Sequence, residues 1–435
     1  MSAPEALAHL GADAFARADV RLHATDQHLA SAYPGEDGRR QPVHTVYVPA
    51  DRYTVDLPER WGREARELVG AHGGYQELAS RLGLDPDLAD QVADRVAVKL
   101  EQDPVEDLRL DFEDGYGDRG DEAEDADAVH AATELASALA ADRAPAFVGL
   151  RFKCFEAPTR RRGIRTLDLF LSTLLEKGGD LPEGLVVTFP KVSTVSQVEV
   201  MVEICERFEG AAGLVPGRIG FEIQVETPQL ILGSDGRVPV AAAIAAGGGR
   251  VTALHYGTYD YSASLQVAPA FQALDHPAAD FAKQVMQVAA AGTGVHLSDG
   301  ATNVIPVGEP DQVWAAWRLH HDLVRRSLRR GFYQGWDMHP GHLPTRFLAT
   351  FAFYRQELAA ATGRLSTYVR RDASAIMDEP ATARALARYL HRGRVCGAVE
   401  EAELEHATGL TSDQIERLAR PKSDTENLAT SRSTP

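Results

Sequence analysis

The chain has 435 residues, of which 44% are hydrophobic and 25% are charged, so it can bury a large core and lacks the composition of a disordered protein. Its 45 Lys and Arg residues against 63 Asp and Glu residues give a net charge of −18, which argues against a nucleic-acid partner, because nucleic-acid binding relies on Lys and Arg. Three widely separated cysteines argue against a disulfide framework or structural zinc, and no stretch resembles a signal peptide or a membrane span. We therefore expect a cytoplasmic globular protein without nucleic-acid or membrane partners.

Residues 1–40 are predicted to form an N-terminal helical extension that stops at Pro34 and Gly35, because both residue types end helices. From residue 41 to about residue 360, short apolar runs alternate with long helical stretches. The eight runs that we interpret as strands cover residues 43–48, 108–112, 146–150, 185–189, 219–225, 251–256, 294–305 and 332–338. Eight strand–helix repeats predict a (β/α)8 TIM barrel of the α/β class, with a doubly wound sheet as the alternative.

The polar residues on these strands favour the barrel. Apolar residues at 221, 223 and 225 alternate with Glu222, Gln224 and Glu226, so one row can face the helices and the other the barrel axis. Most strands also end in a charged or polar side chain, and barrel enzymes carry their chemistry at the carboxyl ends of the strands. These strand-end residues are Asp51, Glu113, Asp114, Arg151, Lys153, Lys191, Glu226, Asp260 and His339.

The strand pattern stops after about residue 365. We predict a small C-terminal helical domain over residues 361–421, with helices near 381–394 and 411–418. The last residues, 422–435, are rich in Ser, Thr and Asn and are predicted to be disordered. The barrel is expected to occupy residues 41–360 between these parts.

Two carboxylates, Glu226 and Asp260, end neighbouring strands and should lie side by side at the mouth of the barrel. Such a pair suits Mg²⁺, which takes one or two protein carboxylates and leaves positions for water and substrate oxygens. The alternative is two unrelated acids that are solvated or paired with basic residues.

Three cations, Arg151, Lys153 and Lys191, follow strands three and four beside these acids. Arg151 could grip a substrate carboxylate with both arms of its guanidinium, and Lys191 could stabilise developing negative charge. The alternative is an internal ion-pair network with Asp111 and Glu113, and the two roles are compatible.

Other conspicuous side chains are assigned structural roles. We expect His320 and His321 to be surface or core histidines, and His255 to be a hydrogen-bonded core residue. Residues 160–162, three consecutive arginines, are interpreted as a solvated basic loop. Cys154 has no neighbouring base in the sequence, so a catalytic thiol is not assigned.

Seven short segments occur together in the order and spacing of a known family. They are 43–49 (VHTVYVP), 111–114 (DFED), 150–151 (LR), 189–192 (FPKV), 225–228 (VETP), 257–261 (GTYDY) and 338–340 (MHP). Over roughly residues 43–345 the chain resembles the HpcH/HpaI aldolase and citrate lyase β-subunit family, which is related to malyl-CoA lyases and malate synthases.

The resemblance implies roles for individual residues. It implies a barrel that binds Mg²⁺, with Mn²⁺ as the alternative ion, through Glu226 and Asp260. It further implies that Arg151 contacts the carboxylate or carbonyl of the substrate. The remaining residues that it places in the substrate site are Glu113, Asp114, Thr227 and Pro228.

Residues 377–382 (MDEPAT) resemble the Met-x-Asp-x-Ala-Thr segment of malate synthases and malyl-CoA lyases, whose Asp is the catalytic base. Glu379 stands at that position here and Asp378 precedes it. Both residues therefore remain candidates for the base.

These features predict a Mg²⁺-dependent carbon–carbon lyase or aldolase that acts on a 2-oxo or hydroxy acid, free or as its coenzyme A thioester, through a metal-stabilised enolate. The alternative is a malate-synthase-like enzyme that condenses glyoxylate with acetyl-CoA. A second alternative is a barrel that binds a metal–oxo-acid complex without turnover. Members of the family are homo-oligomers whose tails help close a neighbour's site, so we expect a homo-oligomer here.

Overall fold

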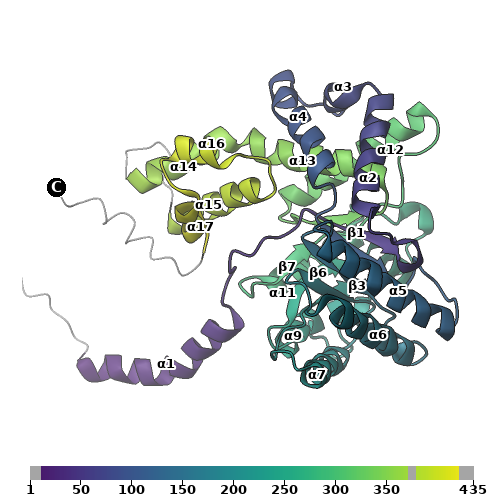
Figure 1. The fold of residues 1–435 in the computed structure, drawn as a ribbon. Helices are drawn as coiled ribbons and strands as arrows, with labels where there is room; N and C mark the ends of the chain where they lie inside the picture. The colour runs from purple at the N-terminus through teal and green to yellow at the C-terminus, as the bar shows by residue number, and fades with distance from the viewer. Residues whose placement is uncertain (1–10, 371–378, 421–435) are drawn as a thin grey trace, which may run out of the picture.

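The computed structural model describes residues 11–370 and 379–420. Its centre is an eight-stranded parallel sheet with the order β7-β6-β5-β4-β3-β2-β1-β8 (Figure 1). The strands are β1 (His44–Pro49), β2 (Asp107–Asp111), β3 (Phe147–Arg151), β4 (Leu185–Phe189), β5 (Phe221–Val225), β6 (Val251–Tyr256), β7 (His296–Ser298) and β8 (Gly335–Asp337). A parallel bridge between Ser298 and Gln334 joins the two outer strands, which confirms the predicted barrel.

Helices surround the barrel in the order in which they follow the strands. They are η1 (Ala50–Arg52), α2 (Leu57–Ala71), α3 (Gly74–Arg81), α4 (Pro86–Gln102), α5 (Asp121–Ala140), α6 (Arg160–Gly178), α7 (Val195–Ala212), α8 (Pro228–Ile231), α9 (Pro239–Ala246), α10 (Thr258–Ser264), η2 (Pro269–Phe271), α11 (Pro277–Ala290), α12 (Pro310–Arg329), η3 (Pro340–His342) and α13 (Leu343–Gln356). None of the helices in the described part of the chain is long and apolar enough to cross a membrane.

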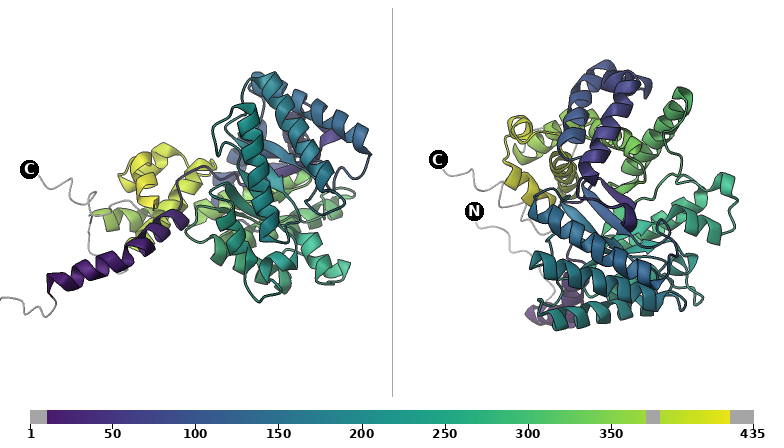
Figure 2. Two further views of the ribbon diagram at one scale, coloured as in Figure 1. Left: turned by 90° about the horizontal axis from the view of Figure 1, so that it is seen from below. Right: turned by 45° about the vertical axis from the view of Figure 1, so that its right-hand side comes forward.

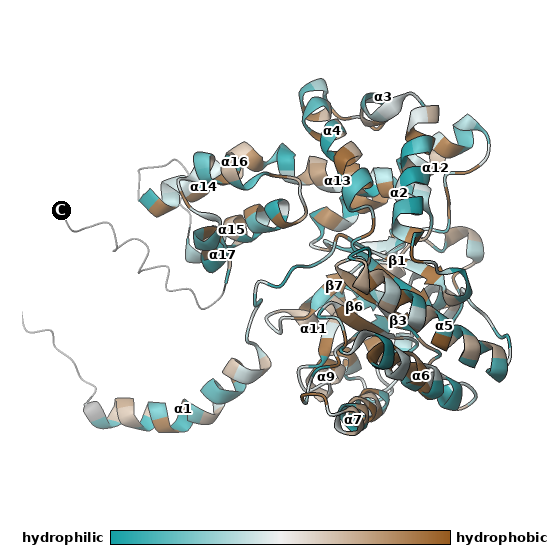
Figure 3. Cartoon of the chain, in the orientation of Figure 1, coloured by the Kyte–Doolittle hydropathy of each residue, from teal (hydrophilic) through white to brown (hydrophobic). Residues whose placement is uncertain are grey.

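The side chains of β5 alternate as predicted. Phe221, Ile223 and Val225 are fully buried, whereas Glu222 lies inside the barrel, where it pairs with Arg109 at 3.0 Å and with His255 at 2.9 Å. Figure 3 shows that apolar segments gather in the strands. Paired charges therefore fill the barrel interior. The side chains that can reach a ligand lie at the carboxyl ends of the strands.

The helices at the two ends of the chain are not part of the barrel. The long helix α1 (Ala12–Ala32) projects away from it in Figure 1 and in the left view of Figure 2. The helices α14 (Leu358–Arg370), α15 (Pro380–Val395), α16 (Glu401–Thr408) and α17 (Ser412–Ala419) pack on one another as a C-terminal unit. This unit contacts the segment that leads into β1 through the ion pair between Arg392 and Glu36, at 3.1 Å, so it lies toward the amino ends of the strands.

Candidate functional site

The carboxyl ends of β2 to β6 bring together most of the charged residues singled out in the sequence. Each is the last residue of its strand or follows it by at most four residues. The parallel strands of a barrel present their carboxyl ends at one rim, so these side chains lie together. The residues gathered there are Asp111, Glu113, Asp114, Arg151, Lys191, Glu226 and Asp260.

Arg151, the last residue of β3, is 6% exposed and lies at the base of this rim. Its Nε and one terminal nitrogen donate hydrogen bonds to the two carboxylate oxygens of Asp111, each at 2.7 Å. The remaining Nη1 makes only long contacts of 3.4 Å to Gln224 and Glu113 within the described chain. Arg151 is thus anchored on one side by the ion pair with Asp111, and its contact with a substrate stays a prediction that the position of Nη1 allows.

Two aromatic rings lie beside the guanidinium of Arg151. The guanidinium carbon lies 4.9 Å from the ring centre of Tyr47 and 5.9 Å from that of Trp336. Trp336 is fixed in turn by a hydrogen bond of 3.0 Å from its Nε1 to Nδ1 of His255. Sequence reasoning missed both aromatic residues, although their inward positions on predicted strands were a usable signal.

Lys191 occupies a backbone conformation that lysine rarely adopts. Its φ is +50°, in the left-handed region. This conformation directs the backbone N–H of Lys191 to Oε1 of Glu226, at 2.8 Å, while the side chain reaches back to Glu113 and to Asp114 at 2.8 Å. Strain of this kind collects at functional sites, where the surrounding structure holds it in place.

The Lys191 ammonium is a counter-ion for the acids of this rim, because it pairs with Glu113 and Asp114. Burial alone would lower its pKa, but Glu113 and the hydrogen bonds with both neighbouring acids raise it above its ordinary value. Lys191 also lies 3.9 Å from Asp260. The lysine is therefore held fully charged, which suits it to stabilise an anion.

Glu226 directly follows β5 and is 1% exposed. Among the described residues, the hydrogen bond to its carboxylate comes from Lys191. Gly257 leaves room for it, because a Cβ on that glycine would lie 2.6 Å from Oε2. Burial, Glu113 and Asp260 raise the pKa of Glu226 well above its ordinary range.

Asp260 lies on the first turn of α10, just beyond β6, rather than at the strand end itself. Burial and the nearby Asp114 raise its pKa, although Lys191 opposes them. Burial and Asp114 likewise raise the pKa of Glu113, against the opposing charges of Arg151 and Lys191. The rim thus holds more carboxylate than positive charge, which is the donor set that a hard divalent cation fits.

Several predicted residues lie elsewhere. Thr227 caps the start of α8 and donates a hydrogen bond of 2.6 Å to the carbonyl of Val192. Pro228 is the first residue of α8, beside Glu226 in sequence. Glu379 is exposed at the start of α15 in the C-terminal unit, and Asp378 lies outside the described residues.

Two expectations about basic residues were wrong. Lys153 does not face the rim, because its ammonium pairs with Glu124 at 2.6 Å and donates to the carbonyl of Phe112 at 2.8 Å. The three arginines do not form a loop but begin α6, where Arg162 pairs with Asp125. Helix α5 supplies both acidic partners, and its contact with α6 was not visible from sequence spacing.

His320, expected to be no ligand, belongs with Asp337 and His342 to a buried group whose ligand atoms lie within 4.8 Å of one another in the described chain. The Asp337 carboxylate already accepts hydrogen bonds from Arg346 at 2.9 Å and from His44 at 2.8 Å. The rings of His320 and His342 are stacked, so their in-plane lone pairs do not converge. We therefore assign this group a structural role.

The model of the family described as "Domain of unknown function (DUF6986)" matches residues 22–423. The chain belongs to this family. No curated protein matches it.

Several solved structures resemble this DUF6986 protein. A Haloferax volcanii malate synthase magnesium/glyoxylate complex has 14% identity and a TM-score of 0.47, over 88% of this chain and 99% of that one. Protein CitE from Mycobacterium tuberculosis, in complex with magnesium, acetoacetate and coenzyme A, has 18% identity and a TM-score of 0.47, over 83% and 99%. A citrate lyase β subunit from M. tuberculosis, with oxaloacetate and magnesium, has 18% identity and a TM-score of 0.40, over 72% and 99%. Because these identities and TM-scores are low, we infer the function of this chain from its own residues.

Proposed function

We propose that the protein is a Mg²⁺-dependent carbon–carbon lyase or aldolase that acts on a 2-oxo or hydroxy acid. The observation that carries this proposal is the rim itself: buried Glu226, with Asp260 on the next strand connection, lies beside an anchored arginine and a charged lysine. Such a set can bind an acid by its oxygens and stabilise negative charge on the adjoining carbon.

The proposed metal ligands are Glu226 and Asp260. Their fit to a divalent cation is supported by the excess of carboxylate at the rim. Burial, and then the neighbouring acids, raise the pKa of both groups. When bound, Mg²⁺ supplies Lewis-acid polarisation of the substrate oxygens. Mn²⁺ would satisfy the same oxygen ligands.

The chain's own residues would perform the other tasks. The unused Nη1 of Arg151 would hold the substrate carboxylate, and Asp111 would keep the guanidinium in place. The Lys191 ammonium would lie beside the enolate oxygen and stabilise its charge. Glu113 and Asp114 hold that ammonium and would orient substrate or water.

The proposed base is Glu379 or Asp378, which would remove or return the proton on the reacting carbon. Glu379 begins α15, whose unit contacts the amino-end side of its own barrel through Glu36. A base from this segment would therefore come from a neighbouring copy, in line with the proposed homo-oligomer.

Methyl-proton exchange in D₂O tests the function directly, because it reports enolate formation. Pyruvate, glyoxylate and acetyl-CoA would be incubated singly and in pairs with protein and Mg²⁺, and followed by NMR. Glu226→Gln should abolish exchange, whereas Glu176→Gln, an exposed glutamate on α6, should leave it unchanged.

The substrates that exchange would decide between the candidates. Exchange of pyruvate supports the aldolase. Condensation of glyoxylate with acetyl-CoA, or exchange of acetyl-CoA alone, would replace it with a malate-synthase-like or malyl-CoA-lyase-like activity. Metal binding without any exchange would overturn the proposal in favour of a barrel that binds an oxo acid without turnover.

A further inference from the structure

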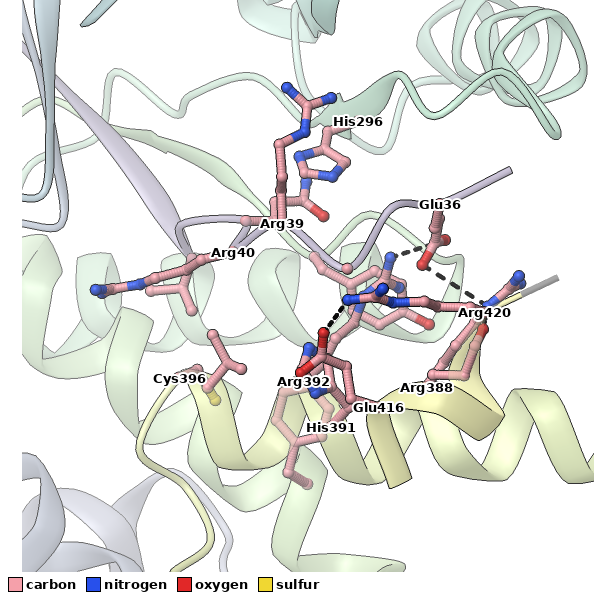
Figure 4. A pocket seen from close by; sticks show the side chains of 17 residues that line it. Glu36, Arg39, Arg40, His296, Arg388, His391, Arg392, Cys396, Glu416 and Arg420 are labelled. Atoms are coloured by element: carbon pink, nitrogen blue, oxygen red, sulfur yellow. Dashed lines mark hydrogen bonds and ion pairs between the residues drawn. The ribbon is translucent and has the colours of Figure 1, made fainter. Parts of the chain in front are cut away.

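A cavity lies at the amino-end side of the barrel, opposite the rim of charged residues (Figure 4). Residues 36–43, which lead into β1, form one wall, and α15 and α17 form another. Its volume is about 40 Å³, enough for a small group but not for a large ligand. Five arginines but two carboxylates line it, in a chain whose net charge is −18: Arg39, Arg40, Arg388, Arg392 and Arg420, with Glu36 and Glu416.

Three of these arginines pair with carboxylates other than Glu36. Arg39 pairs with Asp37 at 2.5 Å, and Arg40 pairs with Glu106 at 3.2 Å. Arg420 pairs with Glu416, which lies one turn before it in the sequence.

The other two arginines share one carboxylate. Glu36 lies 3.1 Å from Arg392 and 3.7 Å from Arg388. Each guanidinium is held by a second contact. Arg392 lies over the ring of Tyr333 at 4.1 Å, and Nε of Arg388, the nitrogen that faces Glu36, donates to the carbonyl of Ala419 at 2.8 Å. Two positioned guanidiniums therefore converge on a position that a single carboxylate fills.

Two imidazoles at the cavity are consistent with uncompensated positive charge. The pKa of His296 is lowered to about 4 by burial, Arg392 and Arg39, which outweigh Glu36 and Asp37. Burial and the neighbouring arginines also lower the pKa of His391, whose Nδ1 is buried and has no hydrogen-bond partner among the residues that the structure describes.

The position of Glu36 indicates the kind of group that this cavity accepts. Its side chain is 37% exposed and belongs to a segment without helix or strand, so it can leave the arginines at small cost. An oxyanion already lies between the two guanidiniums, but it brings one negative charge. A phosphate brings up to two charges and more acceptor oxygens to the same donors.

We propose that this cavity binds a phosphate group, free or as the monoester of a small molecule. Arg388 and Arg392 bind the phosphate oxygens, and Glu36 competes for the same position. The bound phosphate replaces the contact by which residues 36–43 hold α15. This proposal is independent of the chemistry at the barrel rim.

Calorimetric titration of the full chain with inorganic phosphate and with glycerol 3-phosphate tests the site, against chloride at equal ionic strength. Arg392→Gln should abolish binding. Glu36→Gln should bind about fivefold more tightly, the factor that corresponds to a strong exposed ion pair. Arg165→Gln, an exposed arginine that pairs with Asp125 on the far side of the barrel, should bind like the unchanged protein.

The two variants have opposite expected effects, so the test remains decisive if Arg392→Gln misfolds. Absence of saturable binding in both the unchanged protein and Glu36→Gln would overturn the proposal. Weaker binding by Glu36→Gln, or an equal loss in Arg165→Gln, would also overturn it. Binding of both ligands supports a monoester as the occupant, and binding of inorganic phosphate alone supports free phosphate.

Discussion

The side chain of Arg151 divides its donors between the protein and an open position. Two of them bind Asp111 in a parallel pair, a geometry that the single ammonium of lysine does not reproduce. We expect Arg151→Lys to lower kcat/KM for the exchange reaction by about a hundredfold, and to destabilise the fold by about 1 to 2 kcal/mol. Kinetics and urea unfolding would measure the two effects.

The outer arginine Arg165 provides the matched control for this change, because it pairs with Asp125 at an exposed position. Arg165→Lys should alter neither quantity measurably. An unchanged kcat/KM in Arg151→Lys would contradict the assignment of Arg151 to the substrate.

Glu226 is expected to weaken the fold when no metal is bound. Its folded-state pKa is raised by burial, Glu113 and Asp260, so the ionised form is less favourable in the folded than in the unfolded protein. We expect Glu226→Gln to stabilise the protein in EDTA at pH 7.5, by on the order of 1 kcal/mol. Thermal unfolding would measure this.

The same variant should lose the response to Mg²⁺. The unchanged protein should gain about 2.7 kcal/mol at a hundredfold excess of ion over the dissociation constant, because only the folded state binds it. A variant that keeps the Mg²⁺ response would show that Glu226 is not a ligand, and a variant that is less stable in EDTA would contradict the argument from its raised pKa.

At the scale of single elements, the packing of β3 on β4 depends on a missing side chain. Gly149 pairs with Val186, and a Cβ on Gly149 would overlap the carbonyl oxygen of that residue. We expect Gly149→Ala to destabilise the protein by about 3 kcal/mol or more, because neither backbone can move within the barrel. Denaturant unfolding would measure the loss.

Gly178, the last residue of α6, is the control for this substitution. No atom lies within 4 Å of a Cβ there, and its φ is not in the left-handed region. Gly178→Ala should be neutral or stabilise by up to about 1 kcal/mol. Equal effects of the two substitutions would contradict the packing argument.

The elements that sequence periodicity predicted best are those whose pattern is local. The alternation in β5 and β2 marks each strand within about two residues, since 219–225 was predicted for Phe221–Val225 and 108–112 for Asp107–Asp111. The strand predicted at 294–305 has only three residues, His296–Ser298, in the structure. Gly294 precedes it with a φ of 81°, and at Ser298 the barrel closes through a bridge to Gln334. Closure depends on contacts between distant segments, which no local pattern contains.

At the scale of the whole molecule, buried histidines should make stability depend on pH. Burial and Arg325 lower the pKa of His321 from 6.5 to about 4, against the pull of Asp322. Between these values the unfolded state binds a proton that the folded state does not. The contribution of His321 is therefore complete above pH 6.5 and falls as the pH drops toward 4.

Replacing the histidine should remove this dependence. Between pH 6 and pH 5, the free energy of unfolding of His321→Leu should fall less steeply than that of the unchanged protein, by about 1.2 kcal/mol over this pH unit. Urea unfolding at both pH values would show the difference, since other groups titrate alike in the two proteins. Parallel curves would mean that His321 is protonated in the folded state.

The assembly of the candidate site was predictable in part. Strand order alone places Arg151, Lys191, Glu226 and Asp260 at one rim, so the sequence predicts their neighbourhood. It does not predict which cation faces inward, and Lys153 turns to α5 instead. Nor does it place the C-terminal unit, whose ion pair to the barrel joins Arg392 to Glu36 across 356 positions.

The left-handed backbone of Lys191 makes this one position informative about relatives in the same family. Glycine or asparagine adopts that conformation more easily, by about 1 to 2 kcal/mol for glycine, so drift in the absence of selection for catalysis should replace the lysine with one of them. Under the proposed function, a family member that keeps lysine here retains a residue that is costly to the fold and useful to the reaction. The residue at this position would then separate, from sequence alone, family members that catalyse from those that only bind the acid.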